Sequence, residues 1–251
     1  MLEVRDGAFV GYSGVMADAH DVRGRSTSGW MRWAVAGGVA AVLFAVLAML
    51  VAMRDGRPLP GDLGLHDWSV GHRPDVARTI AVAITDTGSG TVPYLVALVA
   101  GALVGARAFP GIASGAVEVV RRIWGALAAL LLLVALQLVR AGVMNWVGRP
   151  RPPMGDWVGH PTGMSFPSGH TTTSAAAALL LVGAALSVMR GTARAVVVTV
   201  AAVWAVLVGL TRIYLGVHWP TDVLGGWLLV AAAGCLFGAL TSRRTKQDAQ
   251  E

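Results

Sequence analysis

Two segments of the chain carry side chains that could transfer a phosphoryl group. One is a polar stretch that ends with His170, and the other runs from Thr211 to Asp222. His218 and His170 could act as nucleophile and general acid, because a neutral imidazole attacks phosphorus and an imidazolium protonates a leaving oxygen. Asp222 lies four residues after His218, and Pro220 favours a helix start between them. We therefore expect its carboxylate to hold one nitrogen of the His218 ring and to leave the other nitrogen free to attack.

The same two segments are rich in groups that bind anions. Arginine side chains match the planar arrangement of phosphate oxygens. A glycine at a helix start lets the backbone approach a ligand, and free N–H groups and the positive end of the helix dipole attract negative charge there. The expected phosphate-binding residues are Arg149, Arg151, Arg212, Ser168 and Gly169.

The residues near these segments do not indicate a metal site. The chain has one cysteine, Cys235, and no two of its six histidines are spaced four residues apart. The arginines would also repel a metal cation. We therefore expect no metal and no cofactor, and a single cysteine excludes an internal disulfide.

The composition indicates an integral membrane protein. Hydrophobic residues make up 55% of the 251 positions and charged residues only 14%, whereas a soluble domain carries about 25% charged residues. The net charge of +6 comes from basic residues that lie mainly between and after apolar runs. This distribution favours orientation in a membrane over nucleic-acid binding. The expected partners are therefore the bilayer and a lipid phosphate, and not nucleic acid.

Apolar runs long enough to cross a hydrocarbon core of about 30 Å recur along the chain. A polar loop at 54–75 contains a hint of a short interfacial helix, and a short helix with a kink at 86–90 precedes the second span. The expected spans are 34–53, 91–106, 123–147, 170–189, 195–215 and 220–240. The sequence thus predicts an all-α fold, with a bundle of six transmembrane helices at 30–241, a mobile cytoplasmic N-terminal tail at 1–29 and a cytoplasmic C-terminal tail at 242–251.

The distribution of arginine and lysine predicts the orientation of this bundle. Six spans place both termini on one side, and that side holds 12 basic residues against 8 on the other. By the positive-inside rule, both termini then lie in the cytoplasm and the protein resides in the plasma membrane. The two segments with the histidines follow the third and fifth spans, so we expect them to meet on the extracytoplasmic face.

The order and spacing of the motifs also resemble those of a known family. Pro167-Ser168-Gly169-His170, followed by Arg212-x5-His218-x3-Asp222, resembles the second and third signature motifs of the type 2 phosphatidic acid phosphatase (PAP2) superfamily. Arg151-Pro152 resembles the end of its first motif, Lys-x6-Arg-Pro. The resemblance covers residues 30–240 and implies the membrane-embedded bacterial lipid phosphatase branch, with six spans.

This resemblance also implies a mechanism. His218 would form a phosphohistidine, Asp222 would orient its ring, and His170 would protonate the leaving group and then deprotonate water. The family uses no metal. The phosphoryl oxygens would be held by Arg151, Arg212 and the backbone N–H groups of Ser168 to His170.

The chain departs from the first motif of the family. Counting back from Arg151, Met144 stands in the place of the lysine, and counting back from Arg149 gives Gly142. Arg140 lies one helical turn, about 6 Å, before Met144 and has the reach to replace the missing cation. We expect Arg149 to replace it, because Arg149 shares a rigid Arg-Pro-Arg-Pro segment with Arg151.

These observations predict metal-independent dephosphorylation of a lipid phosphate or diphosphate at the outer leaflet. A site at the membrane interface requires a substrate with a long apolar tail. A polyprenyl diphosphate such as undecaprenyl diphosphate is the first choice, because the lysine-poor composition is typical of a high-GC bacterium that recycles carrier lipids outside the cell. Phosphatidic acid and phosphatidylglycerol phosphate are the other candidates.

Two further classes of function remain open at this point. A lipid phosphotransferase on the same fold would pass the phosphoryl group to a hydroxyl instead of water. A weakened or inactive homologue would only bind phospholipids, although both histidines are present. A transporter is disfavoured, because its mid-span segments should carry ionisable residues.

Overall fold

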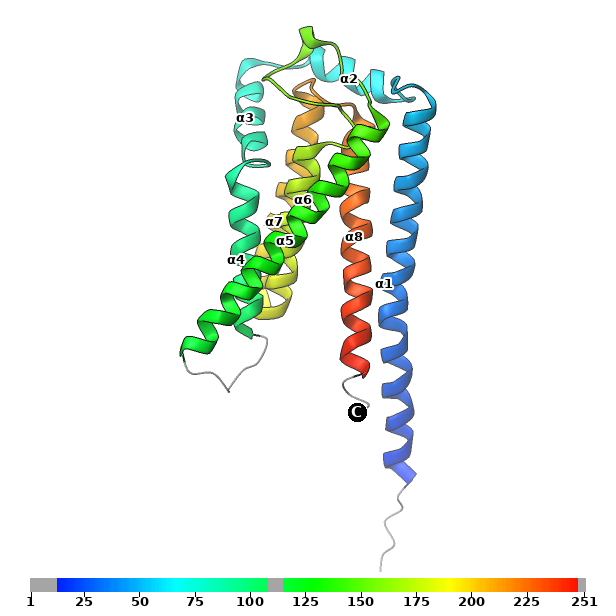
Figure 1. Cartoon of the computed structure of the whole chain (residues 1–251), viewed down its shortest axis with the longest axis vertical. Coiled ribbons are helices and arrows are strands. Elements are labelled where there is room, and N and C mark those ends of the chain that lie inside the picture. The colour runs from blue at the N-terminus through cyan, green and yellow to red at the C-terminus, as the bar shows by residue number, and fades with distance from the viewer. Residues whose placement is uncertain (1–12, 108–114, 248–251) are drawn as a thin grey trace, which may run out of the picture.

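The structure is a computed structural model, and it describes residues 13–107 and 115–247, with side chains described for 29–107 and 115–242. Over this part of the chain it is all helical (Figure 1). The helices are α1 (Ser13–Met53), α2 (Asp62–Gly71), α3 (Asp75–Asp86), α4 (Thr91–Arg107), α5 (Gly115–Val147), the short 3-10 helix η1 (Met154–Asp156), α6 (Gly169–Val188), α7 (Gly191–Tyr214) and α8 (Pro220–Gln247). The predicted all-α fold is confirmed.

The helices are long and apolar enough for a multi-pass membrane protein. By length and composition, α1, α5, α6, α7 and α8 each qualify as a membrane span. The helices α3 and α4 form a sixth span if they are counted together, with a bend of 46° at the break between them. The break includes Gly90, whose φ of 62° is a conformation that residues with a Cβ rarely adopt. The kink expected from the sequence is therefore present.

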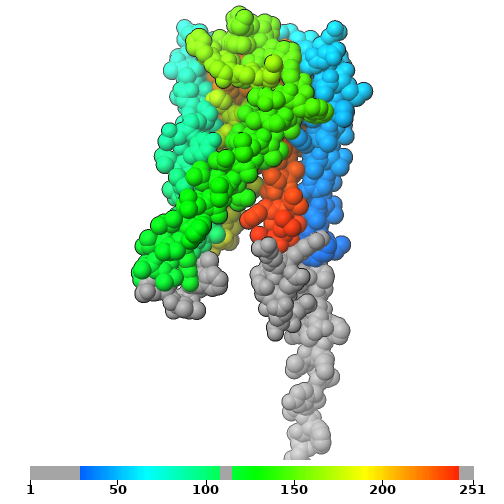
Figure 2. Space-filling view, in the orientation of Figure 1, coloured from blue at the N-terminus to red at the C-terminus, as the bar shows by residue number. Residues whose placement is uncertain are grey.

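The helix α6 lies within the bundle and contacts α4, α5, α7 and α8. On one side α1 packs along α8, and on the other α4 packs along α5 (Figures 1 and 2). The buried face of α6 consists of small side chains, which are Thr171, Thr172, Thr173, Ser174, Ala176, Ala177, Ala178, Ala184 and Ala185. Small residues let neighbouring helices approach closely. Several helices therefore meet around the N-terminal end of α6.

Two glycines bring α4 and α5 into close contact. A Cβ at Gly101 would lie 2.7 Å from the Cβ of Ala129, and a Cβ at Gly105 would lie 3.0 Å from the carbonyl carbon of Arg121. Neither position has room for a larger side chain. The four-residue spacing is that of the small-residue pairs that pack membrane helices, and it fixes α5 against the rest of the bundle.

The helix α2 runs across one end of the bundle (Figure 1). It is the short helix expected in the loop 54–75, but its orientation is unusual. Asp62, His66 and Ser69 are buried, whereas Leu63 and Trp68 are exposed. Two of these buried side chains meet polar partners, since His66 Nε2 lies 3.0 Å from a carboxylate oxygen of Asp156 and Asp62 pairs with Arg149. The polar face of α2 thus belongs to the inside of the protein.

The ends of the chain differ from the predicted tails. The helix α1 begins at Ser13, so residues 13–29 continue this helix, and α8 extends to Gln247 inside the predicted C-terminal tail. Residues 1–12 and 248–251 lie outside the described part of the chain, so the predicted mobility of the N-terminal tail stays a prediction. The first residues of α1 and the last residues of α8 lie at the end of the bundle opposite to α2 (Figure 1).

Candidate active site

His218 lies in the turn between α7 and α8, near the end of the bundle that α2 covers. The backbone N–H groups of Val217 and His218 both donate to the carbonyl oxygen of Arg212, at 3.3 and 3.2 Å. Gly216 has a φ of 71°, in the left-handed region where a Cβ is strained. This glycine lets the chain fold back at the end of α7, and the His218 side chain is left only 1% exposed.

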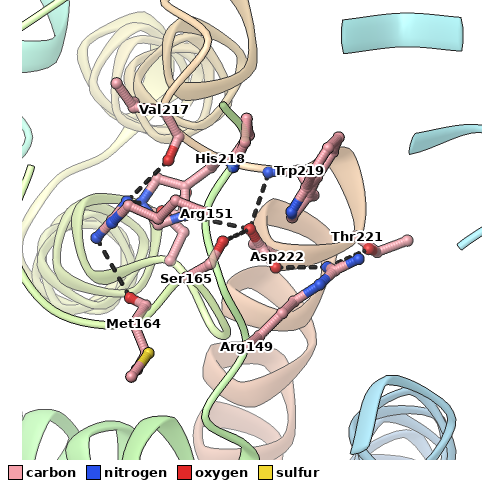
Figure 3. A network of polar contacts seen from close by, with 12 residues as sticks. Arg149, Arg151, Met164, Ser165, Val217, His218, Trp219, Thr221 and Asp222 are labelled. Atoms are coloured by element: carbon pink, nitrogen blue, oxygen red, sulfur yellow. Dashed lines mark hydrogen bonds and ion pairs between the residues drawn. The ribbon is translucent and has the colours of Figure 1, made fainter. Parts of the chain in front are cut away.

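Asp222 holds the His218 ring from the first turn of α8 (Figure 3). Its carboxylate is fully buried, and Oδ2 accepts from the Trp219 N–H at 2.8 Å and from the Ser165 hydroxyl. The same oxygen lies 3.3 Å from His218 Nδ1. The contact expected from the four-residue spacing is therefore present.

The neighbours of His218 define its tautomer. Arg151 Nη1 lies 2.9 Å from His218 Nε2 (Figure 3), and a guanidinium can only donate. Nε2 must therefore accept, and the ring proton resides on Nδ1, which donates to Asp222. This tautomer leaves Nε2 without a proton, and its lone pair points at a cation that could instead hold an anionic group.

Burial sets the charge state of His218. The pKa of its imidazole falls from 6.5 to about 4, mainly because burial disfavours the charged ring, and the charges of Arg151 and Arg212 act in the same direction. The hydrogen bond to Asp222 opposes this shift only in part. The ring is therefore neutral at pH 7, as a nitrogen nucleophile requires.

The loop between α5 and α6 wraps the side chain of Arg151. Its Nε and Nη2 donate to the carbonyl oxygens of Gly163 and Thr162 at 3.0 and 2.9 Å, and Nη1 donates to that of Val217 at 2.8 Å. Burial lowers the pKa of Arg151, and nearby Arg140 adds to this effect. The guanidinium is thus fixed with one edge toward His218.

Arg149 lies in a buried network of ion pairs and hydrogen bonds. Its side chain is fully buried, and Nη1 and Nη2 form ion pairs with Asp222 at 2.6 Å and with Asp62 at 2.7 Å. Its Nε donates to the carbonyl oxygen of Gly56 at 3.3 Å, and Nη1 also donates to Thr221. All three nitrogens are thus engaged. The expectation that Arg149 binds phosphate disagrees with this geometry, because the two buried carboxylates occupy its donors.

Asp62 on α2 completes this buried network. Its Oδ1 accepts from the backbone N–H and the hydroxyl of Thr221, both at 3.0 Å, and Oδ2 accepts from the Leu59 N–H at 2.8 Å. Removing one member of a buried ion pair leaves the other charge uncompensated. Asp62 therefore fixes Arg149, and Arg149 in turn fixes the carboxylate of Asp222.

Arg212 presents a free donor within the protein. It is 6% exposed, and Nη1 donates to the Thr85 hydroxyl at 2.9 Å. Among the described residues, its buried Nε–H has no hydrogen-bond partner. Leaving a buried donor unpaired costs free energy, so this group is placed to meet an acceptor that enters from outside the protein. The predicted assignment of Arg212 to phosphate binding fits this position.

The start of α6 contributes His170 and a free helix end. His170 Nε2 lies 2.9 Å from the Ser89 hydroxyl, which comes from the break between α3 and α4. His170 interacts electrostatically with Arg151, Arg212 and His218, so these four side chains form one cluster. The Ser168 N–H already donates to the Asp222 carbonyl at 3.1 Å. The N–H groups available for an anion are therefore those that follow Ser168, beginning with Gly169.

In the parts of the chain that the structure describes, no three His, Cys, Asp or Glu side chains gather as metal ligands would. The expectation of chemistry without a metal stays a prediction.

Comparison with known proteins adds a family to this geometry. Residues 123–246 match the model of the PAP2 superfamily. The chain carries a PAP2 superfamily domain. The crystal structure of a transmembrane PAP2 type phosphatidylglycerolphosphate phosphatase from Bacillus subtilis has the same fold, with a TM-score of 0.63 and 24% identity, over 84% of this chain and 96% of that chain.

Two curated relatives of the PAP2 domain carry different substrate names. Phosphatidylglycerophosphatase B of Bacillus subtilis is 38% identical over 113 residues, which are 43% of this chain and 54% of that protein. The undecaprenyl-diphosphatase of Sulfolobus acidocaldarius is 41% identical over 71 residues, which are 28% of this chain and 30% of that protein. The chain thus spans about half the length of the first relative and less than a third of the second.

Several polar residues at the site of the PAP2 domain were not predicted from the sequence. Four of them contact predicted residues directly and lie far from them in the chain: Asp62, Thr85, Ser89 and Ser165. The sequence does not set Asp62 apart, because its burial beside exposed Leu63 and Leu65 is visible only in the structure. The hydroxyl residues offer no signal either, because serine and threonine are common at turns and helix ends.

Proposed function

We propose that the protein is a lipid phosphatase that works through a phosphohistidine on His218. The observation that carries this proposal is the arrangement of Arg151, His218 and Asp222. Asp222 accepts a hydrogen bond from the Nδ1–H of His218, and the lone pair of Nε2 faces the cation of Arg151. A neutral imidazole held in this tautomer is a nucleophile without further activation.

The proposed reaction has two steps. Nε2 donates its lone pair to phosphorus, Nη1 of Arg151 turns from Nε2 to a phosphoryl oxygen, and the bond from phosphorus to the leaving oxygen breaks. His170 gives its proton to that oxygen. In the second step His170 takes a proton from water, the resulting hydroxide attacks phosphorus, and the P–N bond breaks to return the lone pair to Nε2. Arg212 stabilises the added negative charge in both transition states.

The substrate follows from the membrane setting and from the named relatives. A site at the end of a membrane bundle suits a phosphate on a long apolar tail. We propose undecaprenyl diphosphate as the first substrate and phosphatidylglycerol phosphate as the second, because relatives carry both names. Phosphate release from a panel of these lipids and phosphatidic acid in mixed micelles, with Mg2+ or with EDTA, tests the proposal. A phosphotransferase would release little phosphate until a hydroxyl acceptor is added, and a binding protein would release none.

The low pKa of His218 predicts activity that persists in mild acid. Nε2 attacks only while the ring is neutral, and the neutral ring prevails above a pKa of about 4. We expect kcat/KM to stay level down to about pH 5 and to fall as the pH drops further, because kcat/KM reports the free enzyme. Profiles for two lipids whose phosphates differ in pKa separate ionisation of the enzyme from that of the substrate. A shared loss of activity near pH 6.5 would contradict the proposed state of His218.

We propose that both termini lie in the cytoplasm and the site lies outside, because basic residues are in excess on the side of the termini. Met154→Cys, in a Cys235→Ala background, places a thiol at a residue that is 76% exposed near the site. It should react with an impermeant thiol reagent in intact cells. The matched control is Glu118→Cys, near the start of α5 at the opposite end of the bundle (Figure 1), which should react only after lysis. The reverse pattern would place the site in the cytoplasm.

A further inference from the structure

We propose that Arg140 on α5 binds a phosphoryl oxygen of the substrate at the start of α6, as the cation that the first motif lacks at Met144. This inference rests on the proposed function. The inference starts from Arg149, whose hydrogen-bond donors already meet Asp62, Asp222, the Gly56 carbonyl oxygen and the Thr221 hydroxyl. Some other residue must therefore supply the missing charge.

The guanidinium of Arg140 lies against the first residue of α6. A Cβ at position 169 would lie 3.4 Å from Arg140 Nη1 and 3.6 Å from Cζ, so the side chain fills the space that Gly169 leaves open. The N–H groups of this helix turn have no partner within the helix, and the helix dipole is positive there. A cation at this place is repelled by the helix end unless an anion lies between them. A bound anion would therefore make this position of Arg140 more favourable.

A chain of hydrogen bonds holds Arg140 in this place. Its Nε donates to Gln137 Oε1 at 2.9 Å, and Gln137 Nε2 donates to the Thr173 hydroxyl at 2.7 Å. That hydroxyl in turn donates to the Gly169 carbonyl oxygen at 2.7 Å. The chain links α5 to α6, so the guanidinium is oriented toward the helix start before any ligand arrives. Orientation before binding lowers the entropic cost of binding.

The remaining nitrogens of Arg140 are available to a ligand. Nη1 contacts the sulfur of Met144 at 3.4 Å, which is a weak acceptor. Among the side chains that the structure describes, none accepts a hydrogen bond from Nη2, and no acid pairs with the guanidinium. Arg140 also interacts with the charge of Arg151 beside His218. A phosphoryl group held by Arg151 therefore lies within the field of Arg140.

Variants of the full-length protein in detergent test this assignment. Arg140→Met removes the cation, and Arg140→Met/Met144→Lys restores a positive charge one turn further along α5. The matched control is Arg54→Met, at an exposed arginine just after α1. Two quantities are measured for each variant: kcat/KM for phosphate release, and the affinity for tungstate, a phosphate mimic, from the increase in Tm.

We expect Arg140→Met to lower kcat/KM about a hundredfold and to weaken tungstate binding by about tenfold or more. The double variant should recover most of both losses, and Arg54→Met should match the wild type. A purely structural role would lower Tm without tungstate and would not be rescued at position 144. Arg140→Met that behaves like Arg54→Met in both assays would overturn the proposal.

The two readouts separate this inference from the proposed function. If the wild type releases no phosphate, the proposed function fails, and tungstate affinity alone then decides the role of Arg140. If Arg140→Met does not fold, Arg140→Gln takes its place with the same expectations, since glutamine keeps a polar side chain near the Gln137 amide. Wild-type tungstate affinity in that variant would overturn the assignment of Arg140.

Discussion

Replacing His218 with alanine is expected to lower phosphate release by about 10⁴-fold or more, because the variant has no nitrogen to attack phosphorus. Lipid binding should remain, since Arg151, Arg212 and the start of α6 are unchanged. The measurement is steady-state phosphate release together with tungstate affinity. A second measurement uses the wild type and a lipid whose phosphoryl group is labelled. When the reaction is quenched in alkali during turnover, the label should be found on the protein. The reason is that a phosphohistidine survives alkali and is lost in acid.

His160→Ala is the matched control for this prediction. His160 is exposed in the loop between α5 and α6, so its loss should leave turnover within about twofold of the wild type. If the turnover of His218→Ala is within tenfold of that of the wild type, the phosphohistidine proposal is contradicted. Loss of both turnover and tungstate binding would instead indicate that the substitution disrupts the site as a whole.

Replacing His170 with alanine should affect two substrates unequally. A general acid contributes about 10²–10⁴-fold in rate, and the contribution is largest where the leaving oxygen is most basic. We expect a loss of about 10³-fold on phosphatidic acid, whose leaving group is an alkoxide, and a loss smaller by about tenfold or more on undecaprenyl diphosphate, whose leaving group is a phosphate. The quantity to compare is kcat/KM, because the later attack of water does not enter it when the first step is irreversible.

Ser89→Ala provides the control for His170. The Ser89 hydroxyl lies 2.9 Å from His170 Nε2, so its removal should loosen the ring and lower kcat/KM by a similar, small factor on both lipids. Equal losses on both lipids in His170→Ala would contradict the role of His170 as the proton donor. A smaller loss on phosphatidic acid than on the diphosphate would also contradict it.

The helices of the fold could be predicted closely because each membrane span is visible in the sequence as a long apolar run. An apolar run of about 20 residues can only satisfy its backbone in lipid as a helix, and the predicted spans lie within or close to the helices of the structure. The break at Gly90 was visible as a cluster of glycine and polar residues. The N-terminal end of α1 was missed, because residues 13–29 are polar and a helix outside the bilayer leaves no hydrophobic signal.

The site could be predicted only where its contacts are local. His218 lies just before α8 and Asp222 lies in its first turn, so the local fold of four residues brings them together. Arg149 shows the opposite case. Its role depends on Asp62, 87 residues earlier in the chain, and a sequence does not reveal which distant carboxylate will meet a given arginine. The preference for Arg149 over Arg140 relied on its closeness to Arg151 in the sequence, and the sequence does not show that Arg149 pairs with two buried carboxylates.

The buried pair of Asp62 and Arg149 shows that the site depends on helices outside the part of the chain that matches the family. The family match begins at residue 123, yet Asp62, Thr85 and Ser89 orient Arg149, Arg212 and His170 from helices and a turn that precede it. The matched portion holds the residues proposed to react, but not all of the residues that position them. A transplant of residues 123–246 into a foreign bundle would therefore carry His218 and Asp222 without the residues that position Arg149, Arg212 and His170. Reshaping the first four helices offers a route to retune the proposed activity while the residues proposed to react stay the same.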